Sequence, residues 1–209
     1  MGAPTATIAE VIVVANHEVP KADLLYEGKA KKVYRTDDPA LCIIEYKDDA
    51  TAFNAEKRGV IENKGIYNNK ISEHFILYLA RHGLATHYVR RLNDREALVR
   101  SVEIIPLEVV VRNIVAGSLA KRLGIEEGTP LKDPVVEFYY KDDALGDPLV
   151  TRSHVRILKV ATDNEMDHLE REALRINDLL QAFLSNLNIA LVDFKLEFGR
   201  IGQTIVLAD

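Results

Sequence analysis

Short apolar runs follow one another through the first half of the chain, which is typical of β-strands. They are separated by stretches such as TDDPA at 36–40, which predict turns. The predicted strands are 24–35, 41–46, 87–92, 96–105 and 107–115. The segment 130–150 contains three prolines and is predicted to be mainly loop.

Two longer segments show the 3.6-residue repeat of amphipathic helices. The first, 63–83, ends at Gly83, where a C′ glycine is expected. Its apolar stripe consists of Tyr67, Ile71, Phe75, Tyr78 and Leu79. The second, 162–188, has Asp163 as its predicted N-cap. Its stripe consists of Met166, Leu169, Ala173, Ile176, Leu180, Phe183 and Leu187. A short helix is also expected at 117–124.

The end of the chain predicts a β-hairpin. One strand is expected at 189–198, a turn through Gly199 and Gly202, and a return strand at 204–209. Strands therefore dominate the first part of the chain, and strands mixed with helices make up the rest. This order predicts an α+β fold, with a weakly marked division near 101–107.

Composition narrows the possible functions. The chain has 209 residues, 47% of them hydrophobic, and a net charge of −5. The acidic balance argues against a general nucleic-acid binder but leaves room for a local basic pocket for a small anion. No apolar run approaches the roughly 18 residues that span a bilayer, so no membrane association is expected. The single cysteine, Cys42, is interpreted as a core residue, and the lack of an internal disulfide fits a reducing cytosol.

Positive charge gathers after a glycine in YEGKAKKVY at 26–34. In a strand, Lys29 and Lys31 would lie on one face, and Gly28 would let a ligand approach the backbone. Two ammonium groups on one face repel each other and are better tolerated opposite an anion such as phosphate. The alternative is an exposed edge strand that lysines protect against aggregation.

The alternation in LVDFKLEF at 191–198 places Asp193, Lys195 and Glu197 on one face of a strand. Asp209 ends the apolar return strand, and two carboxylates on adjacent strands suit Mg²⁺. The spacing does not decide whether Asp209 faces Asp193 or Glu197. The alternative is a solvated outer face with alternating charges.

A third candidate is VVVRNIVAGSLAKRLG, in which a strand leads into Arg112 and Gly117 and Ser118 open a short helix. A helix N-terminus with a serine hydroxyl can bind an anion, and an arginine can grip phosphate or carboxylate with two hydrogen bonds. The alternative is a capped helix with a surface arginine.

Taken in order, these stretches resemble one enzyme family over 22–209. The stretches YEGKAKKVY, DDATAFNAEKRGVIENKGIYNNKIS, PLEVVVRNIVAGSLAKRLGIEEG and LVDFKLEFG followed by VLAD are similar to those of SAICAR synthetase, the phosphoribosylaminoimidazole-succinocarboxamide synthase of purine biosynthesis. The resemblance implies a cytoplasmic, homodimeric, ATP- and Mg²⁺-dependent ligase. This enzyme joins L-aspartate to the carboxylate of carboxyaminoimidazole ribonucleotide (CAIR), giving SAICAR, ADP and phosphate, through an acyl phosphate.

The resemblance also implies a two-part, ATP-grasp-like α+β fold, with an antiparallel sheet in the N-terminal part and a mixed α/β C-terminal part. After an extension at 1–21, residues 22–103 would bind the nucleotide and 104–209 the substrate and metal. The implied ATP-binding residues are Gly28, Lys29, Lys31, Val102 and Ile104. Glu197 and Asp209 would hold Mg²⁺, Arg112 and Ser118 the phosphate end of the ribonucleotide, and Lys195 and Asp193 would be catalytic.

One departure from the family leaves two alternatives. The family continues past VLAD with a Ser-Pro-Asp loop, a helix and another arginine, whereas this chain ends at Asp209, so a truncated C-terminal part is expected. The first alternative is a truncated homologue that binds ATP and Mg²⁺ without activity. The second is a small-molecule kinase, because phosphoryl transfer resembles half of the ligase reaction.

Overall fold

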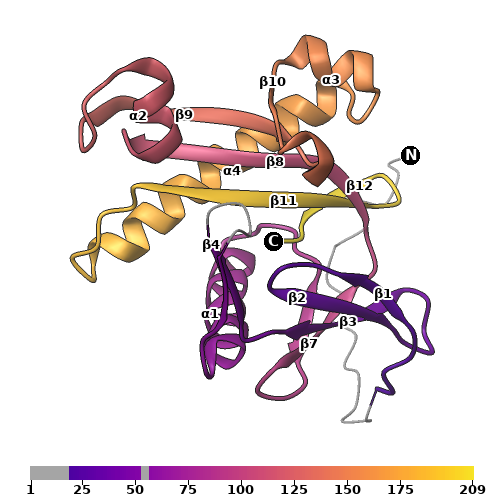
Figure 1. Ribbon diagram of the computed structural model, residues 1–209. Helices are drawn as coiled ribbons and strands as arrows, with labels where there is room; N and C mark the ends of the chain where they lie inside the picture. The colour runs from indigo at the N-terminus through magenta and orange to yellow at the C-terminus, as the bar shows by residue number, and fades with distance from the viewer. Residues whose placement is uncertain (1–18, 53–56) are drawn as a thin grey trace, which may run out of the picture.

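The computed structural model describes residues 19–52 and 57–209, with the backbone alone at 51, 52, 57 and 58. These residues form two five-stranded antiparallel sheets, one above the other in Figure 1, and a separate two-stranded hairpin. The predicted α+β architecture is confirmed. The predicted extension 1–21 lies almost wholly outside the described residues.

The N-terminal sheet is built from strands of the first half of the chain and the C-terminal sheet from strands of the second half. In spatial order, the N-terminal sheet contains β1 (Leu24–Glu27), β2 (Lys31–Arg35), β3 (Leu41–Tyr46), β7 (Glu96–Arg100) and β6 (Tyr88–Arg91). The C-terminal sheet contains β10 (Leu149–Val150), β9 (Pro130–Tyr140), β8 (Glu103–Ile114), β11 (Asp193–Ile201) and β12 (Thr204–Leu207). The hairpin pairs β4 (Asp49–Ala52) with β5 (Lys57–Val60). The helices are α1 (Lys64–Arg81), α2 (Gly117–Leu123), the 3₁₀ turn η1 (Asp143–Leu145), α3 (Arg152–Leu158) and α4 (Asp163–Ser185).

The predicted strand at 24–35 is wrong, because it divides into β1 and β2. The two strands pair antiparallel through a tight turn in which the Gly28 N–H donates to the Lys31 carbonyl at 2.8 Å. Lys29 therefore lies in the turn and Lys31 begins β2, so the two lysines do not share one face of a single strand. Cys42 is buried in β3, as expected.

Long-range pairing also overrides local signals in the C-terminal sheet. The loop predicted at 130–150 is mostly β9, which pairs with β8 over most of its length. Pro130 opens this strand and Pro134 lies at an irregularity in its register, the positions where a strand tolerates proline. The predicted strands 96–105 and 107–115 are also divided differently, because β7 ends at Arg100 and β8 begins at Glu103.

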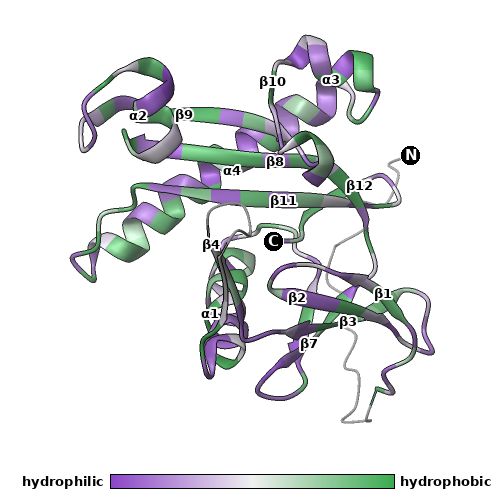
Figure 2. Ribbon diagram, viewed as in Figure 1, coloured by the Kyte–Doolittle hydropathy of each residue, from purple (hydrophilic) through white to green (hydrophobic). Residues whose placement is uncertain are grey.

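Helix α4 covers the apolar face of the C-terminal sheet, behind β8 and β11 in Figure 1. Apolar and polar positions alternate along it in Figure 2. Met166, Leu169 and Ile176 are fully buried against the sheet, as predicted. Leu187 is a wrong prediction, since it follows the helix and is half-exposed.

The ends of the two long helices are set by short-range contacts. In α4 the N-cap is Thr162 rather than Asp163, because the Thr162 and Glu165 side chains bond reciprocally to each other's backbone N–H. After α1, Gly83 adopts the left-handed conformation (φ 81°) expected of a C′ glycine. The α1 stripe is only partly buried, and Tyr67 and Ile71 face outward.

The C-terminal hairpin forms, with its turn at Gly202 rather than through Gly199. Gly199 lies inside β11, where a Cβ would stand 2.6 Å from Val102 Cγ2. This glycine therefore allows the connection between the two sheets to pass close to β11. Among the described residues, neither long helix is apolar enough to cross a bilayer.

Candidate active site

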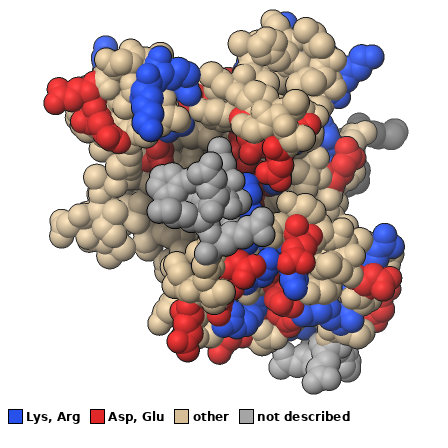
Figure 3. Space-filling view, in the orientation of Figure 1, with Lys and Arg blue, Asp and Glu red and all other residues tan. Residues whose placement is uncertain are grey.

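A cleft of about 810 Å³ separates the β1–β2 hairpin from the polar face of the C-terminal sheet. Strand alternation creates this face, because Val109 and Val111 enter the core while Glu108 points to the opposite side. Figure 3 shows acidic and basic side chains mixed over the N-terminal sheet on the side viewed. A second hollow of about 500 Å³, beside α4 and β12, contains none of the predicted site residues.

Two predicted lysines reach the cleft from the N-terminal sheet. Lys31 bonds to the carboxylate of Asp209 and lies 5.3 Å from the centre of the Tyr46 ring. Lys29 bonds to Asp143 across the cleft at 3.2 Å. Burial opposes the charge on Lys31, but the Asp209 carboxylate outweighs it and raises the pKa of Lys31. The same pair lowers the pKa of Asp209 against the effect of burial, so both groups are charged at neutral pH.

The hairpin register places Asp209 beside Glu197, which resolves the alternative that the spacing left open. The Glu197 N–H donates to the Asp209 carbonyl at 2.8 Å, and the Asp209 N–H donates back to the Glu197 carbonyl at 3.1 Å. Asp193, four positions before Glu197 on β11, instead pairs with Arg112 of β8. The backbones of the two predicted metal ligands are therefore paired directly, Glu197 in β11 and Asp209 two residues after the end of β12.

Glu197 is buried and held by two ammonium groups. Lys141 bonds to Oε2 of Glu197, and Lys195 lies 3.2 Å from its Oε1. Lys195 also donates to Glu108 at 2.5 Å, and this bond and Glu197 raise its pKa although burial lowers it. Among the described residues, no group of three or more metal-binding side chains comes together. Two carboxylates such as Glu197 and Asp209 are the kind of ligand that a hard cation takes together with phosphate and water oxygens.

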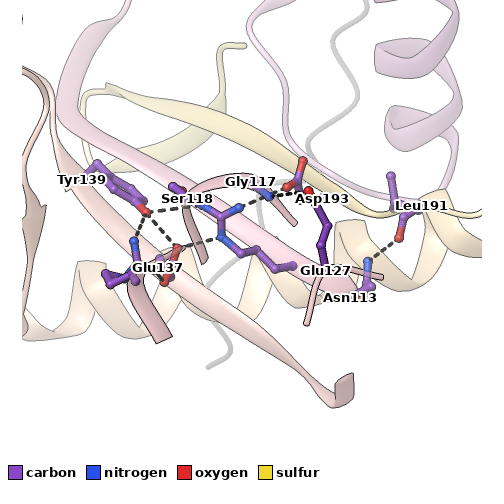
Figure 4. Close-up of polar contacts among 10 residues, drawn as sticks. Asn113, Gly117, Ser118, Glu127, Glu137, Tyr139, Leu191 and Asp193 are labelled. Atoms are coloured by element: carbon purple, nitrogen blue, oxygen red, sulfur yellow. Dashed lines mark hydrogen bonds and ion pairs between the residues drawn. The ribbon is translucent and has the colours of Figure 1, made fainter. Parts of the chain in front are cut away.

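Arg112 lies four residues after Glu108 on β8, on the same sheet face, and donates to four side chains that are labelled in Figure 4. Its guanidinium donates to Glu137 at 2.8 Å and to Asp193 at 3.1 Å. It also donates to Ser118 at 3.0 Å and to the Tyr139 hydroxyl at 3.3 Å. Burial opposes its charge, but Glu137 and Tyr139 raise the pKa of Arg112. The structure thus brings the predicted substrate residues Arg112 and Ser118 together, with Asp193.

The remaining predicted residues divide between the cleft and its surroundings. Gly28, Lys29, Lys31, Lys195, Glu197 and Asp209 line the cleft. Val102 and Ile104 do not line it. Val102 lies in the connection between the two sheets, close to Gly199, and Ile104 is a half-exposed residue near the start of β8.

The family model described as SAICAR synthetase matches residues 24–209. This chain belongs to the SAICAR synthetase family. A phosphoribosylaminoimidazole-succinocarboxamide synthase of Brevibacillus brevis is 58% identical over 190 residues, covering 90% of this chain and 80% of the relative. One of Lysinibacillus sphaericus is 56% identical with the same coverage.

Solved structures of SAICAR synthetases share the fold. The crystal structure of the Ehrlichia chaffeensis synthase matches with a TM-score of 0.87 at 43% identity, covering 90% of this chain and 81% of that one. A SAICAR synthetase in complex with ADP matches with a TM-score of 0.86 at 44% identity, covering 90% and 79%.

The sequence did not predict several side chains of the candidate site. Lys141, Glu137 and Tyr139 belong to β9, which was predicted as loop, so their shared face was invisible. The signal was present in EFYYK at 137–141, where polar positions alternate with Phe138 and Tyr140. Glu108 could have been found in the same way, from its two-residue spacing to Val110 and Arg112.

Proposed function

We propose that this protein is an ATP-dependent ligase of purine biosynthesis that joins L-aspartate to the carboxylate of CAIR, giving SAICAR, ADP and phosphate. Membership of the SAICAR synthetase family supports this function, as does the similarity to a family member in complex with ADP. The observation that carries the proposal is the cleft in which Lys29 and Lys31 oppose the adjacent carboxylates Glu197 and Asp209.

The nucleotide phosphates bind at the β1–β2 turn, to Gly28, Lys29 and Lys31. Both ammonium groups now bond to carboxylates across the cleft, and phosphate oxygens accept the same charge-assisted hydrogen bonds. Gly28 leaves room for a ligand beside the backbone. Val102 and Ile104 bind the adenine, and this part of the proposal rests on the family motif.

Glu197 and Asp209 hold Mg²⁺. Two carboxylates from neighbouring strand positions supply a few oxygen ligands and leave the other positions to phosphate oxygens and water, as this cation prefers. When bound, the cation neutralises charge on the phosphate being transferred. Lys141 and Lys195 orient the Glu197 carboxylate from the two sides.

The ribonucleotide binds further along the same face, with its phosphate at Arg112 and Ser118. Residues four apart on a strand are about 13 Å apart, so β11 carries the metal end of the site at Glu197 and the substrate end at Asp193. Asp193 holds the Arg112 guanidinium at 3.1 Å, and Lys195 lies between the two ends.

This arrangement suits formation of an amide from a carboxylate. A carboxylate is a poor acyl donor, and transfer of the γ-phosphoryl group to it makes an acyl phosphate. The amine of aspartate then forms the C–N bond while phosphate leaves. Lys29, Lys31 and Lys195 offset the repulsion between the anionic reactants, so positioning and electrostatics supply the catalysis.

The proposal extends to the two parts of the chain, the localisation and the oligomeric state. Residues 22–103 form the nucleotide-binding part and 104–209 the substrate- and metal-binding part of a cytoplasmic enzyme. The enzyme is a homodimer, for which the outward-facing Tyr67 and Ile71 on α1 offer apolar surface. Sedimentation at several concentrations measures this state, and a monomer at all of them would contradict it.

An assay of product formation tests the function. Purified protein is expected to release ADP and form SAICAR only when ATP, Mg²⁺, CAIR and L-aspartate are all present. Binding of ADP without turnover would favour an inactive homologue. A stable phosphorylated product formed without aspartate would favour a kinase. A protein that neither binds nor releases ADP would contradict the proposal in every form.

A further inference from the structure

A short main-chain link joins the two sheets two residues before Asp209, which lines the cleft. Residues 85–87, which lead into β6 of the N-terminal sheet, run next to the end of β12. The Leu207 N–H donates to the Ala85 carbonyl at 2.9 Å, and the His87 N–H donates to the Leu207 carbonyl at 2.9 Å. Thr86 and Leu207 thereby form a parallel bridge, whereas all strand pairings within the sheets of the described chain are antiparallel.

The imidazole of His87 reinforces this link. Its Nδ1 lies 2.9 Å from the same Leu207 carbonyl oxygen, and the residue is only 3% exposed. A carbonyl only accepts hydrogen bonds, so this contact assigns the proton to Nδ1. Burial lowers the pKa of His87 and the nearby Lys31 lowers it further, against the bond to Leu207. The Asp209 carboxylate also opposes this lowering, and the lowered pKa favours a neutral ring that donates from Nδ1.

The link holds the chain immediately before Asp209. Leu207 stands two residues before Asp209, and its carbonyl is fixed by two donors from His87. On the other side, the backbone of Asp209 is paired with Glu197 of β11. The segment from Leu207 to Asp209 is thus held by the C-terminal sheet through Glu197 and by the N-terminal sheet through His87.

We propose that His87 is a positioning residue for Asp209: by fixing the Leu207 carbonyl, it sets the direction in which the chain presents the Asp209 carboxylate to the cation in the cleft. This inference rests on the proposed function, since it takes Asp209 as a ligand of Mg²⁺. Residues that orient a metal ligand affect metal affinity by about 10- to 100-fold when they are changed.

The purely structural alternative is that His87 only fills space and stabilises the fold. The two roles differ in what they do to nucleotide binding. A stabilising residue alters folding alone, or weakens nucleotide binding to the same extent with and without metal. A residue that positions Asp209 weakens only the part of the binding that depends on Mg²⁺.

Two substitutions separate the donor from the volume. His87→Leu fills the buried site without a donor, while His87→Asn places an amide nitrogen close to the position of Nδ1. His82→Leu is the matched control, because His82 Nδ1 also contacts a carbonyl, that of Tyr78 at 2.8 Å, on the exposed end of α1. Calorimetry measures ADP binding by each protein in Mg²⁺ and in EDTA.

We expect His87→Leu to bind ADP as wild type does in EDTA and about tenfold more weakly in Mg²⁺. His87→Asn is expected to recover most of this loss, and His82→Leu to match wild type in both conditions. Equal affinities of wild type and His87→Leu in Mg²⁺, or equal losses in both conditions, would overturn the inference. If the wild type itself gains no affinity from Mg²⁺, the metal pair is wrong and the inference fails with it.

A second measurement needs no variant and so does not depend on the folding of His87→Leu. In the wild-type protein, ¹⁵N chemical shifts distinguish the two neutral tautomers of a histidine ring from its charged form. The neutral tautomer with its proton on Nδ1 is expected for His87 at pH 7. A proton on Nε2 alone would overturn the inference, because Nδ1 would then have no proton to donate to the Leu207 carbonyl.

Discussion

The buried pair of Arg112 and Glu137 permits a quantitative prediction for Glu137→Gln. The Glu137 carboxylate accepts from Arg112 Nε at 2.8 Å and from the Tyr139 hydroxyl at 2.9 Å, and it also bonds to Arg122. The two side chains of the pair are 8% and 9% exposed. Glutamine keeps the shape of the side chain and one acceptor, so the substitution removes mainly the negative charge.

Removing one partner of a buried ion pair costs about 3–5 kcal/mol, because the other charge stays buried without compensation. Arg112 retains Asp193 and Ser118, so we take the lower end, about 3 kcal/mol. For a chain of this size, 1 kcal/mol lowers Tm by about 2–4 °C, and the expected loss is about 6–12 °C.

Thermal and urea denaturation measure this loss, with Glu103→Gln as the control. Glu103 also pairs with an arginine, Arg200 at 3.1 Å, but its side chain is 76% exposed. The free energy of unfolding of the control is expected to stay within about 0.5 kcal/mol of wild type. Equal losses for Glu137→Gln and Glu103→Gln would refute the claim that burial gives this pair its importance.

The same pair predicts a pH dependence. Burial raises the pKa of Glu137, but the bonds from Arg112 and Tyr139 outweigh burial and lower it. A carboxyl whose pKa is lowered by folding stabilises the protein above its unfolded pKa of about 4.3, and the stabilisation is lost as the pH falls through the folded value. The difference in stability between wild type and Glu137→Gln is therefore expected to shrink below about pH 4.

Three further predictions test the fold and the cleft. Glu197→Ala is expected to abolish Mg²⁺-dependent ADP binding in calorimetry and to keep the circular dichroism spectrum, because Lys195 retains Glu108; unchanged binding would contradict the metal assignment. Leu169→Ala, at a fully buried site, is expected to lower the free energy of unfolding by about 3 kcal/mol. Leu187→Ala, at a half-exposed site, is expected to change it little. Similar losses for the two variants would contradict the packing of α4 against the C-terminal sheet. Arg95 and the Gly65 N–H lower the pKa of Asp48 to about 2. The difference in unfolding free energy between wild type and Asp48→Asn at pH 7 is therefore expected to vanish as the pH falls from about 4 to about 2. A difference that does not change with pH would argue against the Asp48–Arg95 pair.

The sequence predicted those elements whose own residues determine them. Helix α4 was found because Met166, Leu169 and Ile176 repeat at helical spacing over many turns, and β3 because its apolar run is bounded by turns. In contrast, β9 was missed because the prolines of 130–150 indicated a loop, whereas the short alternation at 137–141 belongs to a strand that pairing with β8 completes. Thr162 was missed as the cap of α4 because Asp163 is an equally good capping residue one position away.

The candidate site shows the same limit. Alternation along β11 correctly placed Lys195 and Glu197 on one face, but the partner of Asp209 depended on hairpin register. Gly199 could equally have been a turn residue, and only its close approach to Val102 shows why it lies within the strand. The division of Lys29 and Lys31 between a turn and a strand likewise depends on pairing between β1 and β2.

The central claim is that the cleft between the two sheets holds a divalent cation and the nucleotide phosphates between Glu197, Asp209 and the β1–β2 turn. Crystals of the protein grown with ADP and Mn²⁺ in place of Mg²⁺ test it directly, since Mn²⁺ is visible by anomalous scattering. We predict an anomalous peak within coordination distance of both carboxylates, with the phosphates beside Lys29 and Lys31. A cation and nucleotide bound elsewhere, with Lys31 still paired to Asp209, would contradict the account.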